Sequence, residues 1–256
     1  KILISFNTKK EMAAATIYTS VIDLANYYST VLKVEQVDSG QEFLTIRMFG
    51  SDWSYYQSSN NLMSLDVRHD STGDPIFWKE TIIHEYTHYV HDISGGFFDP
   101  YSDASGLMIR WWGENTAQFM NEAVAEELGY EYGVGTKWLK SSCGDLEDQE
   151  RYRDPVSDTD NAALYCGVSK IIWDFYDDST MMDSKSGVNE DEDVNMPLKL
   201  IWDKLLSKPH YSLRDVYTTL RTLDINGDDI KGSSEDIELV DKIFELHSAP
   251  NGYEQG

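Results

Sequence analysis

Residues 82–92 read IIHEYTHYVHD, and this stretch predicts the helix at the junction between the two halves of the chain. Its apolar residues recur at helical spacing, and residues 84–88 match the pattern H-E-x-x-H. Because residues four apart on a helix lie on one face, His84 and His88 can both reach a single metal ion. The alternative is a buried helix whose histidines bond to neighbouring side chains.

The residues on either side of this helix differ in the secondary structure that they predict. Before it, a helix from Thr8 to about Val31 precedes β-like segments at 32–37, 43–49 and 62–68. After it, helical spacing occurs in residues 115–128, 160–177, 197–206, 212–222 and 234–247. The sequence therefore predicts an α+β fold. An N-terminal helix, a small mixed sheet and the motif helix occupy residues 1–95, and a mostly helical lobe occupies residues 96–256.

Capping signals place the ends of two of these helices. Asp74 followed by Pro75 predicts the start of the motif helix, and the glycine pair that begins at Gly95 predicts its end. Ser212 with Asp215 three residues later predicts the start of a helix in the second half.

Composition and charge exclude several classes of partner. The net charge is −24, so nucleic acid and anionic membrane surfaces should repel the chain. No apolar stretch approaches the roughly 18 residues of a membrane span. The first residue is Lys1 rather than Met, which indicates a mature or excised fragment. Cys143 and Cys166 would form one disulfide in a secreted protein or remain two free thiols.

The H-E-x-x-H motif also predicts a chemistry. Neutral imidazole suits zinc, which binds histidine nitrogen at about 2.0–2.1 Å. Glu85 follows the first histidine and can accept a proton from a zinc-bound water while that water attacks a carbonyl carbon. We therefore expect zinc-dependent hydrolysis with His84 and His88 as ligands and Glu85 as the general base.

A catalytic zinc needs a third protein ligand. The pattern HExxHxxGxxH does not supply it, because His91 occupies the glycine position and Ser94 the position of the last histidine. A carboxylate on the following helix does supply it, because Glu122 and Glu126 are four residues apart and share a face. Glu122 would bind zinc, and Glu126 would accept a hydrogen bond from a ligand histidine. The alternative for both is a solvated helix face.

Two motifs in this order carry a family resemblance. HEYTH at residues 84–88 followed by NEAVAE at residues 121–126 resembles the gluzincin metallopeptidases, whose thermolysin-like members carry HExxH and then NExxx(D/E). The later segments ALYCGVSKIIWDFYDD, residues 163–178, and DIELVDKIFELHSA, residues 236–249, are weakly similar to fungalysin-like relatives.

The resemblance implies a zinc endopeptidase that cleaves protein or peptide substrates in a cleft between two lobes. The aminopeptidase motif GxMEN does not precede HExxH, which favours an endopeptidase. An edge strand, residues 62–68, would hold the peptide in extended form. A tyrosine or histidine of the helical half would stabilise the oxyanion. Tyr165 is the first choice for this role, and His210 and Tyr130 are the alternatives.

A second metal site is predicted near the C-terminal helix. Oxygen-bearing side chains occupy positions 1, 3, 5 and 12 of an EF-hand-like loop: Asp224, Asn226, Asp228 and Glu235. Asp229 replaces the usual glycine at position 6, so an acidic turn without calcium is the equal alternative. A calcium-bound loop would suit an extracellular or cell-surface protease, which we expect to be a monomer.

Two other functions remain open. One is a non-catalytic surface module with a zinc site, although two histidines and one glutamate leave a ligand position for water and cysteines would more often close a structural site. The other is a zinc hydrolase that acts on a non-peptide amide, which the sequence cannot separate from a peptidase.

Overall fold

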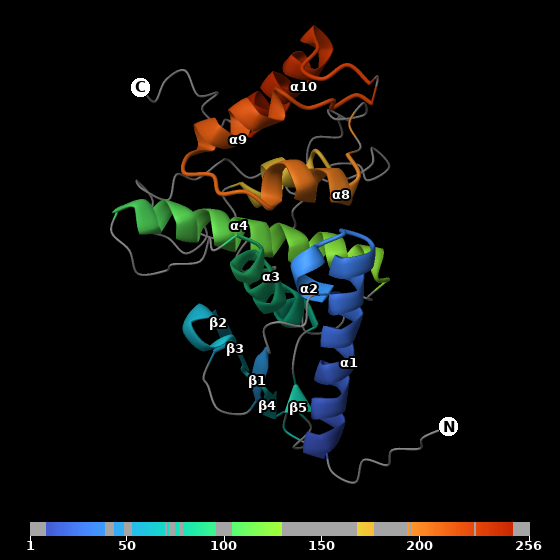
Figure 1. Cartoon of the computed structure of the whole chain (residues 1–256), viewed down its shortest axis with the longest axis vertical. Helices are drawn as coiled ribbons and strands as arrows, with labels where there is room; N and C mark the ends of the chain where they lie inside the picture. Colours follow the sequence, from blue (N-terminus) through green and yellow to red (C-terminus); the bar gives the residue numbers. More distant parts are fainter. Residues whose placement is uncertain are drawn as a thin grey trace. The chain divides into compact units, whose positions relative to one another are not determined.

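The computed structural model of the chain describes residues 9–38, 44–48, 53–69, 71, 75–76, 79–95, 104–129, 168–176, 194, 196–227 and 229–247. Helices and a small three-stranded mixed sheet form this part of the chain, which confirms the α+β class in general terms (Figure 1). The chain divides into two compact units. The division at residue 95 that the sequence suggests stays a prediction.

The first unit contains the described residues up to 95 together with 120–129. Its two long helices are α1, Lys9–Thr30, and α3, Lys79–Gly95, and they pack against each other. A buried hydrogen bond of 2.7 Å joins the Tyr28 hydroxyl to Thr87 Oγ1, and the Tyr28 and Tyr86 rings lie 5.7 Å apart. Burial raises the pKa of Tyr28 and the hydrogen bond to Thr87 opposes this, with the net effect upward. These neutral aromatic contacts fix α3 against α1.

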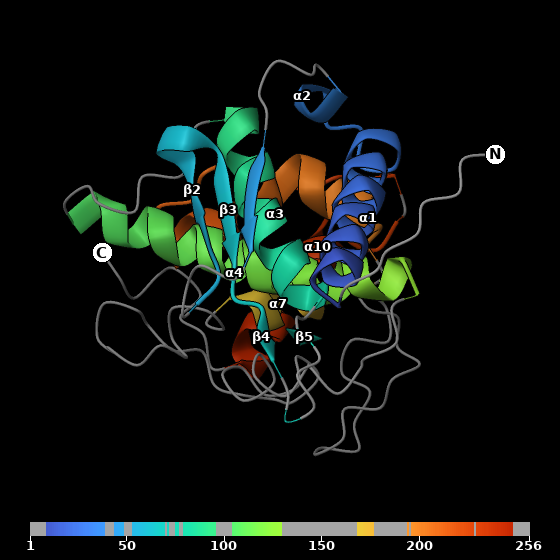
Figure 2. The same cartoon turned by 90° about the horizontal axis from the view of Figure 1, so that it is seen from below.

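The sheet of the first unit has the order β1-β3-β2 and contains strands β1, Thr45–Met48, β2, Tyr55–Gln57, and β3, Leu62–Leu65. The pairing of β1 with β3 is parallel, and the pairing of β2 with β3 is antiparallel across the short 3₁₀ turn η1, Ser58–Asn60. All four residues of β3 are buried, and α3 packs against β2 and β3 (Figure 2). The position of β3 in the middle of the sheet shows that the expectation of a substrate-binding edge strand at residues 62–68 is wrong for residues 62–65.

Two further expectations for the first unit are wrong. Residues 35–37, predicted as strand, belong to the short helix α2, Glu35–Asp38. The chain turns back after α1, where Lys33 has a φ of 60° and the Val34 N–H donates to the Tyr28 carbonyl, so it cannot extend into a strand. Residues 75–76 do not begin a helix.

Pro75 and Ile76 instead form β5, Pro75–Ile76, which pairs antiparallel with β4, Arg68–His69. Proline is compatible with such a pair because its fixed φ also suits extended backbone at a strand edge. The motif helix α3 therefore begins at Lys79, four residues after the predicted proline start.

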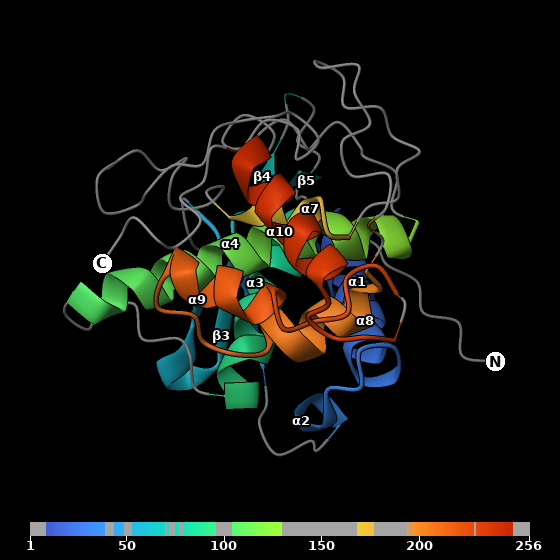
Figure 3. The same cartoon turned by 90° about the horizontal axis from the view of Figure 1, so that it is seen from above.

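The second unit contains residues 104–119 and the described residues from 168 onward. Its elements after α4, Ala104–Glu127, are all helical in the described part of the chain (Figure 3). They are α7, Ser169–Trp173, α8, Leu198–Ile201, the π-helical turn η2, Trp202–Leu206, α9, Leu213–Leu220, and α10, Ser234–Leu246. This agrees with the expected helical second half.

Side-chain caps begin the last two helices. The predicted start of α9 is confirmed, because the Ser212 side chain accepts a hydrogen bond from the Asp215 N–H. Ser233 and Asp236 form a capping box at the start of α10. Among the described helices, none has the length and apolar character needed to cross a membrane.

Candidate metal centre

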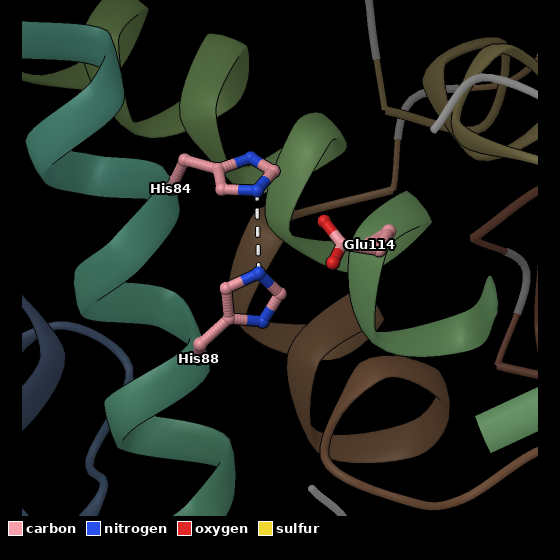
Figure 4. A group of neighbouring side chains, drawn as sticks. All are labelled: His84, His88 and Glu114. Atoms are coloured by element: carbon pink, nitrogen blue, oxygen red, sulfur yellow. Dashed lines mark hydrogen bonds between the residues drawn. The ribbon is translucent and has the colours of Figure 1, made fainter. Parts of the chain in front are cut away.

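His84 and His88 lie one turn apart on the same face of α3 (Figure 4). Both side chains are buried, at 6% and 2% exposure. Their Nε2 atoms face each other at 3.2 Å, and the ring centroids are 4.8 Å apart. The structure thus brings together the two nitrogen atoms that the motif predicts as ligands.

The separation of these nitrogens suits joint binding of one ion. Two nitrogen ligands at 2.0–2.1 Å from a tetrahedral zinc ion lie about 3.3–3.4 Å apart. The observed 3.2 Å is close to this value. The same distance is also a normal hydrogen bond between one N–H and one ring nitrogen. The pair alone therefore fits both a metal site and a buried pair of bonded histidines, and the neighbouring groups are needed to choose between them.

The neighbouring group is Glu114, on α4. Its side chain is 7% exposed, and one of its carboxylate oxygens and one nitrogen of each histidine all lie within 4.8 Å of one another. Figure 4 shows the carboxylate on the side of α4 that faces the two rings. His84, His88 and Glu114 form a group that could hold a metal ion. In the part of the chain that the structure describes, it is the one such group of histidine, cysteine and acidic side chains.

The chemistry of the three side chains also suits a cation. Two imidazoles and one carboxylate are a donor set that suits zinc and leaves a fourth tetrahedral position open. The residues present therefore fit a bound metal ion such as zinc.

Glu85 lies beside His84 on α3 and is buried. Adjacent residues of a helix point about 100° apart around its axis, and Glu85 is not a member of the group with His84 and His88. Its role as general base stays a prediction.

The sequence predicted a different carboxylate from α4. Glu122 is buried, at 7% exposure, but it is not a member of the group with His84 and His88. It follows Glu114 by eight residues, a rise of about 12 Å along a helix. Glu126 is exposed. The roles of Glu122 as a zinc ligand and of Glu126 as the hydrogen-bond acceptor of a ligand histidine stay predictions.

Glu114 was missed because the predicted helix began at residue 115. The structure begins α4 at Ala104, so Glu114 lies well inside the helix. The signal that could have found it is the run WWGENTAQF, residues 111–119, in which Glu114 is the single charged side chain. A charged residue in such a segment is rarely buried without a compensating partner.

Of the three candidates for oxyanion stabilisation, the structure describes His210. Tyr165 and Tyr130 lie outside the described residues, as do Cys143 and Cys166. His210 is described and buried: its Nε2 lies 3.2 Å from the Leu205 carbonyl oxygen and its ring is 4.6 Å from that of Trp112. Burial lowers the pKa of His210 below its ordinary value, and the hydrogen bond to the Leu205 carbonyl opposes this.

The predicted calcium loop is described except for Asp228. The Asp224 carboxylate accepts hydrogen bonds from the N–H groups of Gly227 and Asp229, at 2.9 and 3.0 Å. Asn226 Nδ2 donates to the Glu235 carboxylate at 3.3 Å, so the side chains of loop positions 3 and 12 meet. Asp229 has a φ of 67°, the left-handed conformation that glycine usually provides at position 6.

Asp236 holds this loop from the first turn of α10. Its carboxylate accepts hydrogen bonds from the N–H groups of Ile225 and Asn226, at 2.7 and 3.1 Å, and from Ser233. Burial raises the pKa of Asp236, but these hydrogen bonds outweigh burial and hold its pKa below the ordinary value. These hydrogen bonds tie the described residues of the loop to the start of α10.

Comparison of the chain with protein-family models, with curated proteins and with solved structures finds no match.

Proposed function

We propose that this protein is a zinc-dependent metallopeptidase, an endopeptidase that hydrolyses peptide bonds in protein or peptide substrates. The observation that carries the proposal is the buried group of His84, His88 and Glu114, whose two Nε2 atoms are 3.2 Å apart. The H-E-x-x-H motif and the resemblance of residues 84–126 to gluzincin peptidases support the peptidase assignment.

Each side chain has a role in this proposal. Bound zinc would supply polarisation of the scissile carbonyl and a lowered pKa for water. His84, His88 and Glu114 hold the ion and keep one position open to substrate. Glu85 accepts a proton from the attacking water and returns it to the nitrogen of the departing amine, which completes the hydrolysis of the peptide bond.

Hydrolysis of a non-peptide amide is the second candidate function, because the same groups would perform it. A purely structural zinc site is less well supported, since two histidines and one carboxylate leave a coordination position free. Digestion of an unstructured protein followed by peptide mapping, together with a non-peptide amide substrate, separates these three functions. Internal cleavage supports the endopeptidase, hydrolysis of the amide substrate alone supports the second candidate, and bound zinc with neither activity supports the structural site.

Removal of zinc tests the proposal directly. We expect about one zinc per chain by elemental analysis, and loss of both zinc and peptidase activity after treatment with a chelator, because zinc supplies part of the chemistry. Readdition of zinc should restore activity. A chain purified without zinc, or one that stays fully active after its zinc is removed, would contradict the proposal.

The calcium site at Asp224, Asn226, Asp228 and Glu235 stays a prediction, as do secretion and the monomeric state. A ligand that binds only the folded state raises the melting temperature. Calcium should therefore raise the melting temperature of the wild-type protein, and Asp224→Ala should abolish the rise. The same rise in both proteins would place the ion elsewhere.

A further inference from the structure

Three side chains on one face of α4 contact other residues of the second unit: Trp112, Asn115 and Phe119. At about 100° per residue, these positions fall within about 60° of one another around the helix axis. Glu114 lies about 100° from Asn115 and about 160° from Trp112. The face of α4 that makes these contacts is therefore not the face that carries Glu114.

Asn115 makes the most specific of these attachments. It is fully buried, and its Oδ1 accepts hydrogen bonds from the backbone N–H groups of Val168, at 2.7 Å, and Ser169, at 3.0 Å. These N–H groups belong to the start of α7, where the N-cap residue Val168 provides no side-chain hydrogen bond. The first N–H groups of a helix need an outside acceptor. Asn115 supplies that acceptor from α4.

The other two attachments are less directional. Trp112 Nε1 donates to the Lys208 carbonyl at 2.9 Å. The Phe119 ring lies 6.1 Å from that of Trp173 and 5.8 Å from that of Tyr176, in edge-to-face contacts. Contacts between rings tolerate small rotations, whereas a pair of hydrogen bonds to one buried oxygen does not. The rotation of α4 about its axis is therefore set most sharply at Asn115, the residue next to Glu114.

We propose that Asn115 is a positioning residue for the metal group. Its two hydrogen bonds to the start of α7 fix the rotation of α4 and so aim the Glu114 carboxylate at His84 and His88. Asn115 acts through Glu114 and touches neither metal nor substrate. This inference rests on the proposed zinc site, and it assigns a function to a buried amide that the hydrolytic chemistry does not itself use.

Zinc affinity, measured by competition with a chromophoric chelator, tests this role independently of peptidase activity. Asn115→Ala should bind zinc about 10–100-fold more weakly than the wild type, the usual cost of losing a group that orients a ligand. Asn115→Asp keeps an acceptor oxygen at the same position and should bind zinc within about threefold of the wild type. If Asn115→Ala does not fold, Asn115→Gln, whose acceptor lies one methylene further out, should show the weakened affinity.

Tyr217→Phe is the control in the same unit, because it removes the hydrogen bonds that the Tyr217 hydroxyl makes with Asp241 and Arg221, neither of which belongs to α4. Its melting temperature should fall, and its zinc affinity should equal that of the wild type. Equal zinc affinity in the Asn115→Ala, Asn115→Gln and Tyr217→Phe proteins would overturn the positioning role and leave the zinc site intact. A wild-type protein that binds no zinc would instead overturn the proposed function itself.

Discussion

Replacement of Glu85 with glutamine is expected to leave zinc bound and to remove nearly all peptide hydrolysis. Glutamine keeps the size and shape of the side chain but cannot accept a proton from the attacking water. A positioned general base contributes about 10²–10⁴-fold to a rate, so kcat should fall by at least about 100-fold. The measurement is kcat on a defined peptide, with zinc stoichiometry determined on the same preparation.

The matched control is Glu127→Gln, which makes the same chemical change at an exposed position near the end of α4. It should retain zinc and turnover. If Glu85→Gln keeps kcat within tenfold of the wild type, another group activates the water. If Glu85→Gln loses zinc, the Glu85 carboxylate is needed for metal binding rather than for proton transfer.

The elements that could be predicted from the sequence are those with long periodic patterns or local caps. The helix α1 was expected from Thr8 to about Val31 and is observed at Lys9–Thr30, because its apolar spacing persists over many turns. The start of α9 was predictable because Ser212 and Asp215 are neighbours in sequence and in space. Both signals are local, so no knowledge of the tertiary structure was needed.

The elements that could not be predicted depend on contacts with distant residues. Residues 32–37 contain β-branched side chains, but the hydrogen bond from the Val34 N–H to the Tyr28 carbonyl reverses the chain. Pro75 suits either a helix start or an extended pair, and its pairing with His69 selects the second. Short segments have too little intrinsic preference to resist such contacts.

The candidate site also has a part that the sequence predicts and a part that it does not. His84 and His88 were predictable, because four-residue spacing on a helix is a local property. The carboxylate was not, because many acidic residues of the second half could reach the histidines once the chain folds. Which one does so depends on the axial position and rotation of α4. The sequence pattern favours Glu122, and the structure brings Glu114 to the two histidines.

Alanine substitution of these two glutamates should give opposite results for zinc. Glu114→Ala is expected to lose stoichiometric zinc and all activity, because it removes a group that lies within 4.8 Å of both histidine nitrogens. Zinc affinity should fall by more than the factor of about 10–100 that follows removal of a group that only orients a ligand. Glu122→Ala should retain zinc. The measurement is zinc stoichiometry and affinity at a temperature well below the melting temperature of each variant.

The control is Glu127→Ala, an exposed position that should change neither zinc nor turnover. Loss of zinc in Glu122→Ala with retention in Glu114→Ala would support the sequence-based ligand and require α4 to lie about two turns further along its axis. Loss in both variants has a different consequence. Two histidines and two glutamates would fill all four tetrahedral positions, so no position would remain for water or substrate. That outcome would favour a structural zinc site and contradict the proposed hydrolysis, which makes this pair of substitutions a test of function as well as of the ligand set.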